Sequence, residues 1–214
     1  MFYQTFPSHQ SGASQSSTSA EIGERATGPS DRRLSARPST VLLIGKVSDG
    51  ATDSACLVLN LSEHGLMARL SFTPAVGDAV EIELRGLPRC VAHVRWVNGM
   101  KAGLQFAQRQ NIDPVFSLMS EDGLVARAPR FAVDLDAMVR LGGQQFPARI
   151  VNLSPGGVRL EADVPVELGQ TGQIMLSAQH ICLFGTVRWA EGNAFGMHFS
   201  TPLPLGSLRD CLEG

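Results

Sequence analysis

The sequence predicts an all-β protein that contains two copies of one small antiparallel domain. Short motifs recur at a constant spacing: VRW at 94–96 returns at 187–189, and GLQF at 103–106 returns as GMHF at 196–199, an offset of 93 residues in each case. Within each copy, apolar residues alternate with polar ones, and turn signals separate the runs. This pattern predicts several short strands per copy, arranged as a small barrel or sandwich in which closure hides the strand edges.

The first element in chain order is a tail. Residues 1–30 are rich in Ser, Gly, Gln and Thr, and their aromatic residues are Phe2, Tyr3 and Phe6. Such a segment buries too little apolar surface to offset the entropy of ordering, so we expect it to be disordered. The alternative is a short partner-binding motif around the three aromatic residues.

The two domains are expected at 31–112 and 125–214. The strand signal is a period of two in the apolar residues, interrupted by glycine-containing turns. The alternating apolar positions are Val80, Ile82 and Leu84 in the first domain and Val158 and Leu160 in the second, and the turn signals are VGD at 76–78, LGG at 141–143 and SPGG at 154–157.

Each copy ends in a helical signal, which predicts a short helix over an open end of its barrel. Segment 113–124 is expected to hold a short helix and a linker, with Asp113 as the cap and Pro114 as the first helical residue. The apolar face of this helix is expected at Val115, Leu118 and Met119, and Gly123 is expected to end it. A shorter counterpart in the second copy is indicated by Ser207, Leu208, Cys211 and Leu212.

Composition limits the partners and the compartment. The formal net charge of −2 gives no overall attraction to nucleic acid or anionic lipid. We find neither a leader pattern nor the roughly 20 apolar residues of a membrane span, and expect a cytoplasmic protein without membrane insertion. The scattered cysteines are expected to act as small buried apolar residues rather than as disulfide or zinc partners: Cys56, Cys90, Cys182 and Cys211.

Two polar motifs in the first copy predict a ligand site. The segment DRRLSARPST contains Arg32, Arg33 and Arg37, and NLSEHG begins at 60, about 23 residues after the last of these arginines. A guanidinium can bind phosphate oxygens or the O6/N7 edge of guanine. The second motif offers an amide, a hydroxyl and a glycine, which are Asn60, Ser62 and Gly65.

The order RxxxR, NxSxxG, VRW and GxxF resembles the PilZ domain family, which binds the bacterial second messenger cyclic di-GMP. The resemblance covers about residues 31–210 as two copies. It implies two tandem six-stranded antiparallel β-barrels, each with a short C-terminal helix.

The resemblance also implies roles for the motif residues. Arg33 and Arg37 would clamp guanine edges and phosphates, while Asn60 and Ser62 would form the floor of the site and Gly65 would permit its turn. In this family, an Arg directly before the first motif Arg accompanies binding of a stacked ligand dimer. Arg32 therefore favours two ligand molecules.

The second copy departs from this pattern. Ala126 stands where the first copy has Arg33, Arg127 comes one residue late, and Arg130 aligns with Arg37. The floor motif is intact, with Asn152, Ser154 and Gly157. The second copy is therefore either a weaker ligand site or a vestige that serves as an interaction or dimerisation platform, which leaves a homodimer open.

Other conspicuous residues are given structural roles. His64 is expected to be exposed in a turn, and His93 and His198 lie on strands without triad or metal spacing. Trp96 and Trp189 occupy equivalent places, which favours a shared core or barrel-rim role over base stacking. We find no nucleophile–base pair and no phosphate-cradling loop, so we expect no enzyme, no cofactor and no metal.

Three functions are therefore compared. The leading one is a non-enzymatic cyclic di-GMP receptor that changes conformation and signals to an unidentified protein effector. The alternative is a ligand-free PilZ-like interaction scaffold. An oligonucleotide-binding barrel is disfavoured by the acidic balance and the low aromatic content of 6%.

Overall fold

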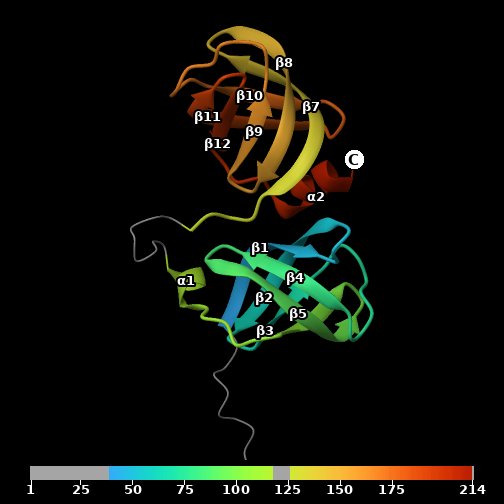
Figure 1. Cartoon of the computed structure of the whole chain (residues 1–214). Coiled ribbons are helices and arrows are strands. Elements are labelled where there is room, and N and C mark those ends of the chain that lie inside the picture. The colour runs from blue at the N-terminus through green and yellow to red at the C-terminus, as the bar shows by residue number, and fades with distance from the viewer. Residues whose placement is uncertain (1–38, 118–125, 214) are drawn as a thin grey trace, which may run out of the picture. The chain divides into compact units, whose positions relative to one another are not determined.

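The computed structural model describes residues 39–117 and 126–213. They form two closed six-stranded antiparallel barrels, which confirms the expected all-β tandem architecture (Figure 1). The tail at 1–30, Arg32, Arg33 and Arg37 lie outside the described residues. The same holds for the helix signals at Leu118, Met119 and Gly123.

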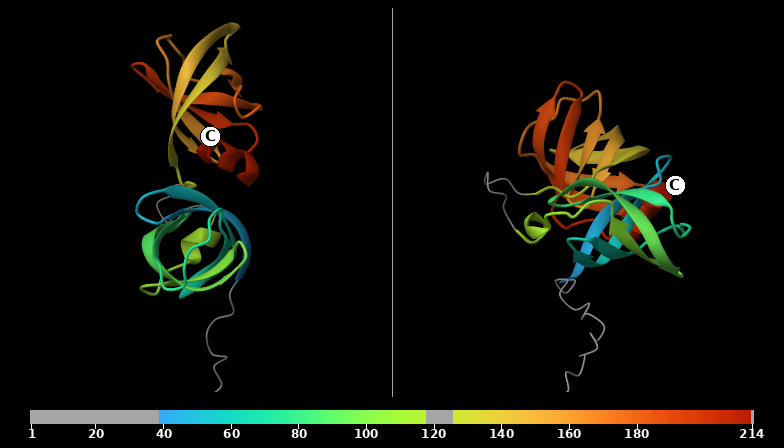
Figure 2. Two further views of the ribbon diagram at one scale, coloured as in Figure 1. Left: turned by 90° about the vertical axis from the view of Figure 1, so that its right-hand side faces the viewer. Right: turned by 60° about the horizontal axis from the view of Figure 1, so that its bottom comes forward.

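The first barrel has the strand order β1-β2-β3-β6-β5-β4, and pairing of β4 with β1 closes it. Its strands are β1 (Ser39–Ser48), β2 (Asp53–Ser62), β3 (Gly65–Arg69), β4 (Ala79–Leu84), β5 (Leu87–Asn98) and β6 (Lys101–Phe106). Figure 2 shows the strands of this barrel as a closed ring.

The second barrel repeats this topology as β7-β8-β9-β12-β11-β10 and closes through β10 and β7. Its strands are β7 (Phe131–Leu141), β8 (Gln144–Ser154), β9 (Gly157–Glu161), β10 (Thr171–Leu176), β11 (Ile181–Glu191) and β12 (Ala194–Phe199). The turn expected at 76–78 lies between β3 and β4, and the turns expected at 141–143 and 154–157 contain the two-residue turns 142–143 and 155–156.

The period of two places the apolar residues inside each barrel. Val80, Ile82 and Leu84 are at most 3% exposed, and Leu160 is fully buried. The partners on the outer face, such as Glu81 and Glu83, are half-buried. Burial of alternate side chains thus drives closure of each sheet.

Helix α1 (Asp113–Phe116) follows the first barrel, and its Val115 is buried in the core of that barrel. The prediction of Asp113 as cap is wrong: Ile112 is the N-cap, and the Asn111 side-chain oxygen accepts a hydrogen bond from the Asp113 N–H. The backbone N–H groups of the first helical turn have no partner within the helix, and a short Asn side chain can accept a hydrogen bond from one of them.

Helix α2 (Leu205–Glu213) follows the second barrel and buries Leu208 and Cys211. It has 9 residues against 4 in α1, so the prediction that the second helix is the shorter one is wrong. Leu203, Leu208 and Cys211 all belong to the second core, and this burial stabilises the longer helix.

The four cysteines are free thiols and differ in exposure. Cys56 and Cys211 are buried, as expected for small apolar residues, but Cys90 is half-buried and Cys182 is exposed. The prediction of a uniformly buried role is therefore wrong for Cys182, whose position on β11 faces outward.

A β-bulge in each of two strands changes which side chains point outward. In β2 the register shifts between Val58 and Asn60, and in β5 it shifts between Val94 and Trp96. The residues before each shift, Val58 and Val94, are fully buried. One extra residue in the bulge therefore directs Asn60 and Trp96 to the outer face rather than into the core.

Candidate functional site

Four residues form a row across the outer face of the first barrel. Asn60 on β2 pairs with Met67 on β3, Met67 pairs with Gly103 on β6, and Gly103 pairs with Trp96 on β5. The row joins NxSxxG, VRW and GxxF, which are separate in the sequence, into one surface. We call these four residues the first row.

The indole of Trp96 lies directly on the backbone of Gly103. A Cβ atom at Gly103 would lie 2.0 Å from the indole Nε1, so only glycine leaves room for the ring. Trp96 is 42% exposed. Of the core and barrel-rim roles expected for Trp96, the core role is therefore wrong, because the bulge in β5 turns the ring to the outer face.

The turn beside the first row is fixed by short contacts. The Ser62 hydroxyl donates a hydrogen bond to the Gly65 carbonyl oxygen at 3.0 Å. A Cβ atom at Gly65 would lie 2.3 Å from the Leu104 carbonyl oxygen. Gly65 is not among the residues with positive φ, and the short distance shows that a glycine here lets β3 pack closely against β6.

Side-chain and backbone groups at the end of β6 and after it also hold this turn. The Arg109 guanidinium donates hydrogen bonds of 2.9 and 2.6 Å to the Glu63 carboxylate. The backbone N–H groups of Phe106 and Gln110 donate to the carbonyl oxygens of His64 and Glu63. His64 is exposed in the turn, as expected. These bonds connect the turn after β2 to the chain at the end of β6 and beyond it.

A hollow of about 360 Å³ lies over the first row. This volume falls within the usual range of small-ligand sites. Its lining brings together Asn60, Ser62 and Gly65 with residues that the sequence had not suggested for the site, which are Met67, Arg95, Gly103 and Gln105. The Arg95 Nε–H donates to the Gln105 side-chain oxygen at 2.5 Å, which orients the guanidinium along the edge of the hollow.

The second barrel builds the same framework. Asn152, Arg159, Gly196 and Trp189 form the second row by equivalent strand pairings. A Cβ atom at Gly196 would lie 1.9 Å from the Trp189 indole Nε1, and Trp189 is 38% exposed. Trp189 thus lies on the outer face for the same reason as Trp96.

The turn of the second barrel is held in the same way. The Ser154 hydroxyl donates to the Gly157 carbonyl oxygen at 3.0 Å, and a Cβ atom at Gly157 would lie 2.6 Å from the Met197 carbonyl oxygen. The N–H groups of Phe199 and Leu203 donate to the carbonyl oxygens of Gly156 and Pro155. The predicted floor motif is therefore a built surface in both barrels.

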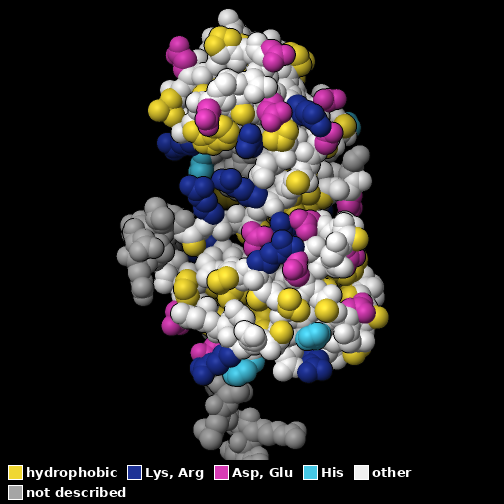
Figure 3. All heavy atoms as spheres, viewed as in Figure 1, with side chains coloured by type: hydrophobic (Ala, Val, Ile, Leu, Met, Phe, Trp, Pro, Cys, Tyr) yellow, Lys and Arg dark blue, Asp and Glu magenta, His cyan; other side chains and the backbone are white. Residues whose placement is uncertain are grey.

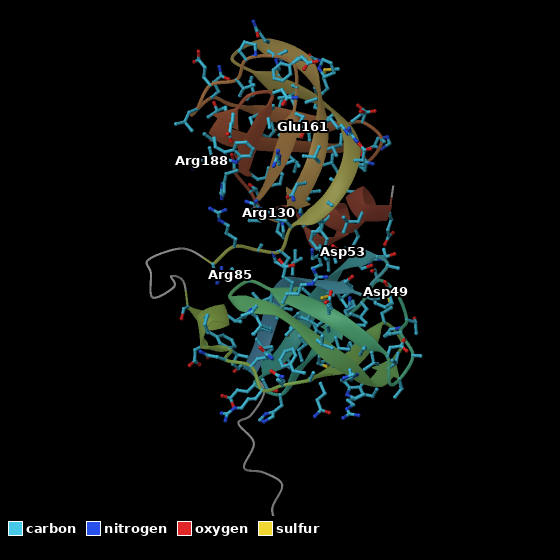
Figure 4. The ribbon with its side chains drawn as sticks, viewed as in Figure 1. Asp49, Asp53, Arg85, Arg130, Glu161 and Arg188 are labelled. Atoms are coloured by element: carbon cyan, nitrogen blue, oxygen red, sulfur yellow. The ribbon has the colours of Figure 1, made fainter. Side chains whose placement is uncertain are left out.

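The side chains on these frameworks differ. Arg159 replaces Met67, and its guanidinium lies 5.7 Å from the centre of the Trp189 ring. Arg127 and Arg130 are exposed near the start of β7, and Arg188 is exposed on β11 (Figure 4). Figure 3 shows Lys and Arg side chains along the lower part of the second barrel in this view, and Asp and Glu side chains over the rest of it.

In the ranges 39–117 and 126–213, no three His, Cys, Asp or Glu side chains are grouped as they would be around a metal ion. None of the helices within the same ranges is both long enough and apolar enough to span a bilayer.

Comparison with known proteins assigns both halves of the chain to one family model. The model described as PilZ domain matches residues 31–115 and 125–214. A search of the curated proteins finds no match.

Solved structures that match this chain include the Borreliella burgdorferi PlzA protein in complex with c-di-GMP, at 12% identity and a TM-score of 0.39 over 80% of this chain and 87% of that chain. Escherichia coli YcgR in complex with c-di-GMP is 13% identical, with a TM-score of 0.30 over 80% and 81%. The Bacillus subtilis inhibitor of motility MotI/DgrA is 11% identical, with a TM-score of 0.30 over 80% and 92%.

Proposed function

This chain belongs to the PilZ domain family, and we propose that it is a cytoplasmic, non-enzymatic receptor that binds cyclic di-GMP on its first barrel. The observation that carries the proposal is the hollow over the first row, which is lined by the Trp96 indole, the Asn60 amide and the Ser62 hydroxyl. Planar bases stack on such a ring, and each stacked base contributes about 1–3 kcal/mol.

The polar groups around the hollow suit the remainder of a guanine nucleotide. Asn60 offers both a donor and an acceptor to a base edge, and Arg95 offers N–H donors to a phosphate or to guanine O6/N7. Both residues line the same hollow as Trp96. A base on the indole would therefore have hydrogen-bonding partners along its edges.

The lead-in arginines complete the proposed site. Arg33 and Arg37 would close over the ligand from the segment before β1, and Arg32 favours a stacked pair of ligand molecules. Charge-assisted bonds of this kind contribute about 1.5–3 kcal/mol each. The proposed signal is a change in this segment that alters binding of a protein effector, because a ligand shifts an equilibrium only through differential affinity for its two states.

A PilZ-like scaffold without a ligand is the second candidate function. It is favoured by one observation, which is the absence of an arginine at Ala126 in the second copy. This observation concerns the second barrel alone, so it fits a chain in which one barrel binds the messenger and the other binds a partner.

The test is isothermal titration of the full chain with cyclic di-GMP, using a matched pair of variants. Trp96→Ala removes the open indole of the first row, and Trp189→Ala removes the equivalent indole of the second row. We expect the first variant to weaken the tighter binding event by roughly 10- to 100-fold, since stacking contributes about 1–3 kcal/mol. The second variant should leave that event unchanged.

Two outcomes would overturn the proposal. One is the absence of heat for the wild-type chain at any accessible concentration, which would favour the scaffold. The other is wild-type affinity in Trp96→Ala, which would move the ligand away from the first row. A stoichiometry near two for the wild-type chain, retained in Trp189→Ala, would support a ligand dimer on the first barrel.

A further inference from the structure

The two rows differ at one position in the middle of the floor. Met67 and Arg159 occupy equivalent places, each between the Asn and the Gly on which the indole rests. In the first barrel, Met67 lines the hollow together with Trp96. The second barrel has an arginine at this place, so the surroundings of its indole are chemically different.

Arg159 lies over the ring that a base would need. Its guanidinium carbon is 5.7 Å from the centre of the Trp189 ring, within the range of a cation–π interaction. A planar guanidinium on an indole occupies the same face as a stacked purine. A base on Trp189 would therefore compete with Arg159 for this face of the ring.

The charges beside the two rows also differ. In the first barrel, the next outward pair after Met67 is Arg69 and Lys101, both exposed cations. In the second barrel, the equivalent pair is Glu161 and Ala194. The Glu161 carboxylate lies 4.0 Å from the Arg159 guanidinium and is labelled in Figure 4. It partly neutralises the charge of Arg159.

We propose that Arg159 is a specificity-determining residue that closes the second row to purine stacking, so that the two PilZ barrels are not equivalent nucleotide sites. This inference rests on the proposed function, because it takes the open indole of the first row as the place where a base binds. The ligand class concerned is an anionic purine nucleotide, which binds on the first barrel and is excluded from the second.

Tryptophan fluorescence separates the two rows, since each contains one of the two Trp residues of the chain. Trp96→Phe leaves Trp189 as the reporter of the second row, and Trp189→Phe leaves Trp96 as the reporter of the first. The probe is guanosine monophosphate at up to millimolar concentration, because a stacked purine quenches indole emission. The tested variant is Trp96→Phe/Arg159→Met, which gives the second row the residue of the first.

We expect no saturable quenching of Trp189 in Trp96→Phe and saturable quenching once Arg159→Met is added. The control is Trp96→Phe/Arg140→Met, which removes an exposed arginine of the same barrel away from the row and should behave like Trp96→Phe. Quenching of Trp189 that is present with Arg159 and weaker without it would overturn the inference, because Arg159 would then bind the ligand. Equal absence of quenching in all three variants would also overturn it.

Failure of the proposed function has a different signature. It would appear as unquenched Trp96 in Trp189→Phe with saturating cyclic di-GMP, whatever happens at Trp189. If guanosine monophosphate then quenched Trp189 only after Arg159→Met, the result would still show that Arg159 keeps a base off the Trp189 ring.

Discussion

The two barrels share their framework and differ in the groups that they present on it. Both have the β-bulges, the glycine under an indole and the serine hydroxyl bonded across the turn. Met67 and Arg69 in the first barrel correspond to Arg159 and Glu161 in the second. The comparison shows that the same backbone carries different side chains around the indole, so the backbone alone does not define a ligand site.

The largest expected difference between the barrels concerns the arginine clamps. Arg33→Ala/Arg37→Ala should weaken cyclic di-GMP binding by about 100-fold or more, because two charge-assisted bonds of about 1.5–3 kcal/mol each are lost. The matched variant Arg127→Ala/Arg130→Ala should change the affinity less than about threefold, a difference of about 0.7 kcal/mol. Titration calorimetry measures both, and equal losses in the two variants would contradict a division of roles between the barrels.

The second prediction concerns what the barrels share. Gly65→Ala and Gly157→Ala each place a Cβ against a backbone oxygen, at 2.3 and 2.6 Å. Overpacking of this kind lowers the free energy of unfolding by about 1–3 kcal/mol. Urea denaturation should show a similar loss for both variants.

Gly156→Ala is the control for these variants, because nothing lies within 4 Å of its added Cβ. It should change the free energy of unfolding by less than about 0.5 kcal/mol. If Gly65→Ala were as mild as this control, close packing of β3 against β6 would not explain the glycine.

The sequence predicted the repeat, the barrels and the floor motifs, but not which residues of these motifs lie side by side on the barrel surface. A strict period of two from Val94 places Trp96 in the core, and the bulge at Arg95 reverses this. A bulge has no reliable signal in a single sequence, because the extra residue is an ordinary one. Met67 was missed for a related reason: its place beside Asn60 and Gly103 follows from strand register, which joins residues distant in the chain.

The glycines could be predicted only in part. Gly65 was expected to permit the turn that precedes it, and the structure adds a second requirement, which is the close approach of β6. Gly103 was recognised only as part of a repeated GxxF motif. Its requirement arises from the Trp96 indole on the neighbouring strand, a contact that appears only once the barrel has closed.

The third prediction concerns a variant in which the first row receives the arginine of the second row. Met67→Arg should place a guanidinium on Trp96 and weaken cyclic di-GMP binding by about tenfold, equivalent to about 1.4 kcal/mol. Met138→Arg is the control, since it makes the same change on the outer face of β7, away from either row. Fluorescence titration of Trp96 in a Trp189→Phe background measures the effect. Tighter binding in Met67→Arg would show that an arginine at this place assists the ligand.

The fourth and smallest expected effect concerns a buried thiol in the core of the first barrel and its influence on the free energy of unfolding. Cys56 on β2 pairs with Gly45, and Ala148 occupies the equivalent place in the second barrel, where it pairs with Ala137. Burial raises the pKa of the Cys56 thiol to about 12, against about 9 in the unfolded chain. Between these values the unfolded chain loses the proton first, so the free energy of unfolding falls as the pH rises above about 9, and the thiol has no such effect at neutral pH.

At pH 10 this loss should amount to about 1 kcal/mol, since one pKa unit corresponds to about 1.4 kcal/mol. Cys56→Ala removes the titrating group, so the variant should lose less stability than the wild-type chain between pH 7.5 and pH 10 in urea denaturation. Ala148→Cys gives the matched test in the other direction, because a buried thiol there should add the same alkaline sensitivity to the second barrel. If Cys56→Ala kept the full pH dependence, the thiol would not be its source, and the two cores would be alike in this respect.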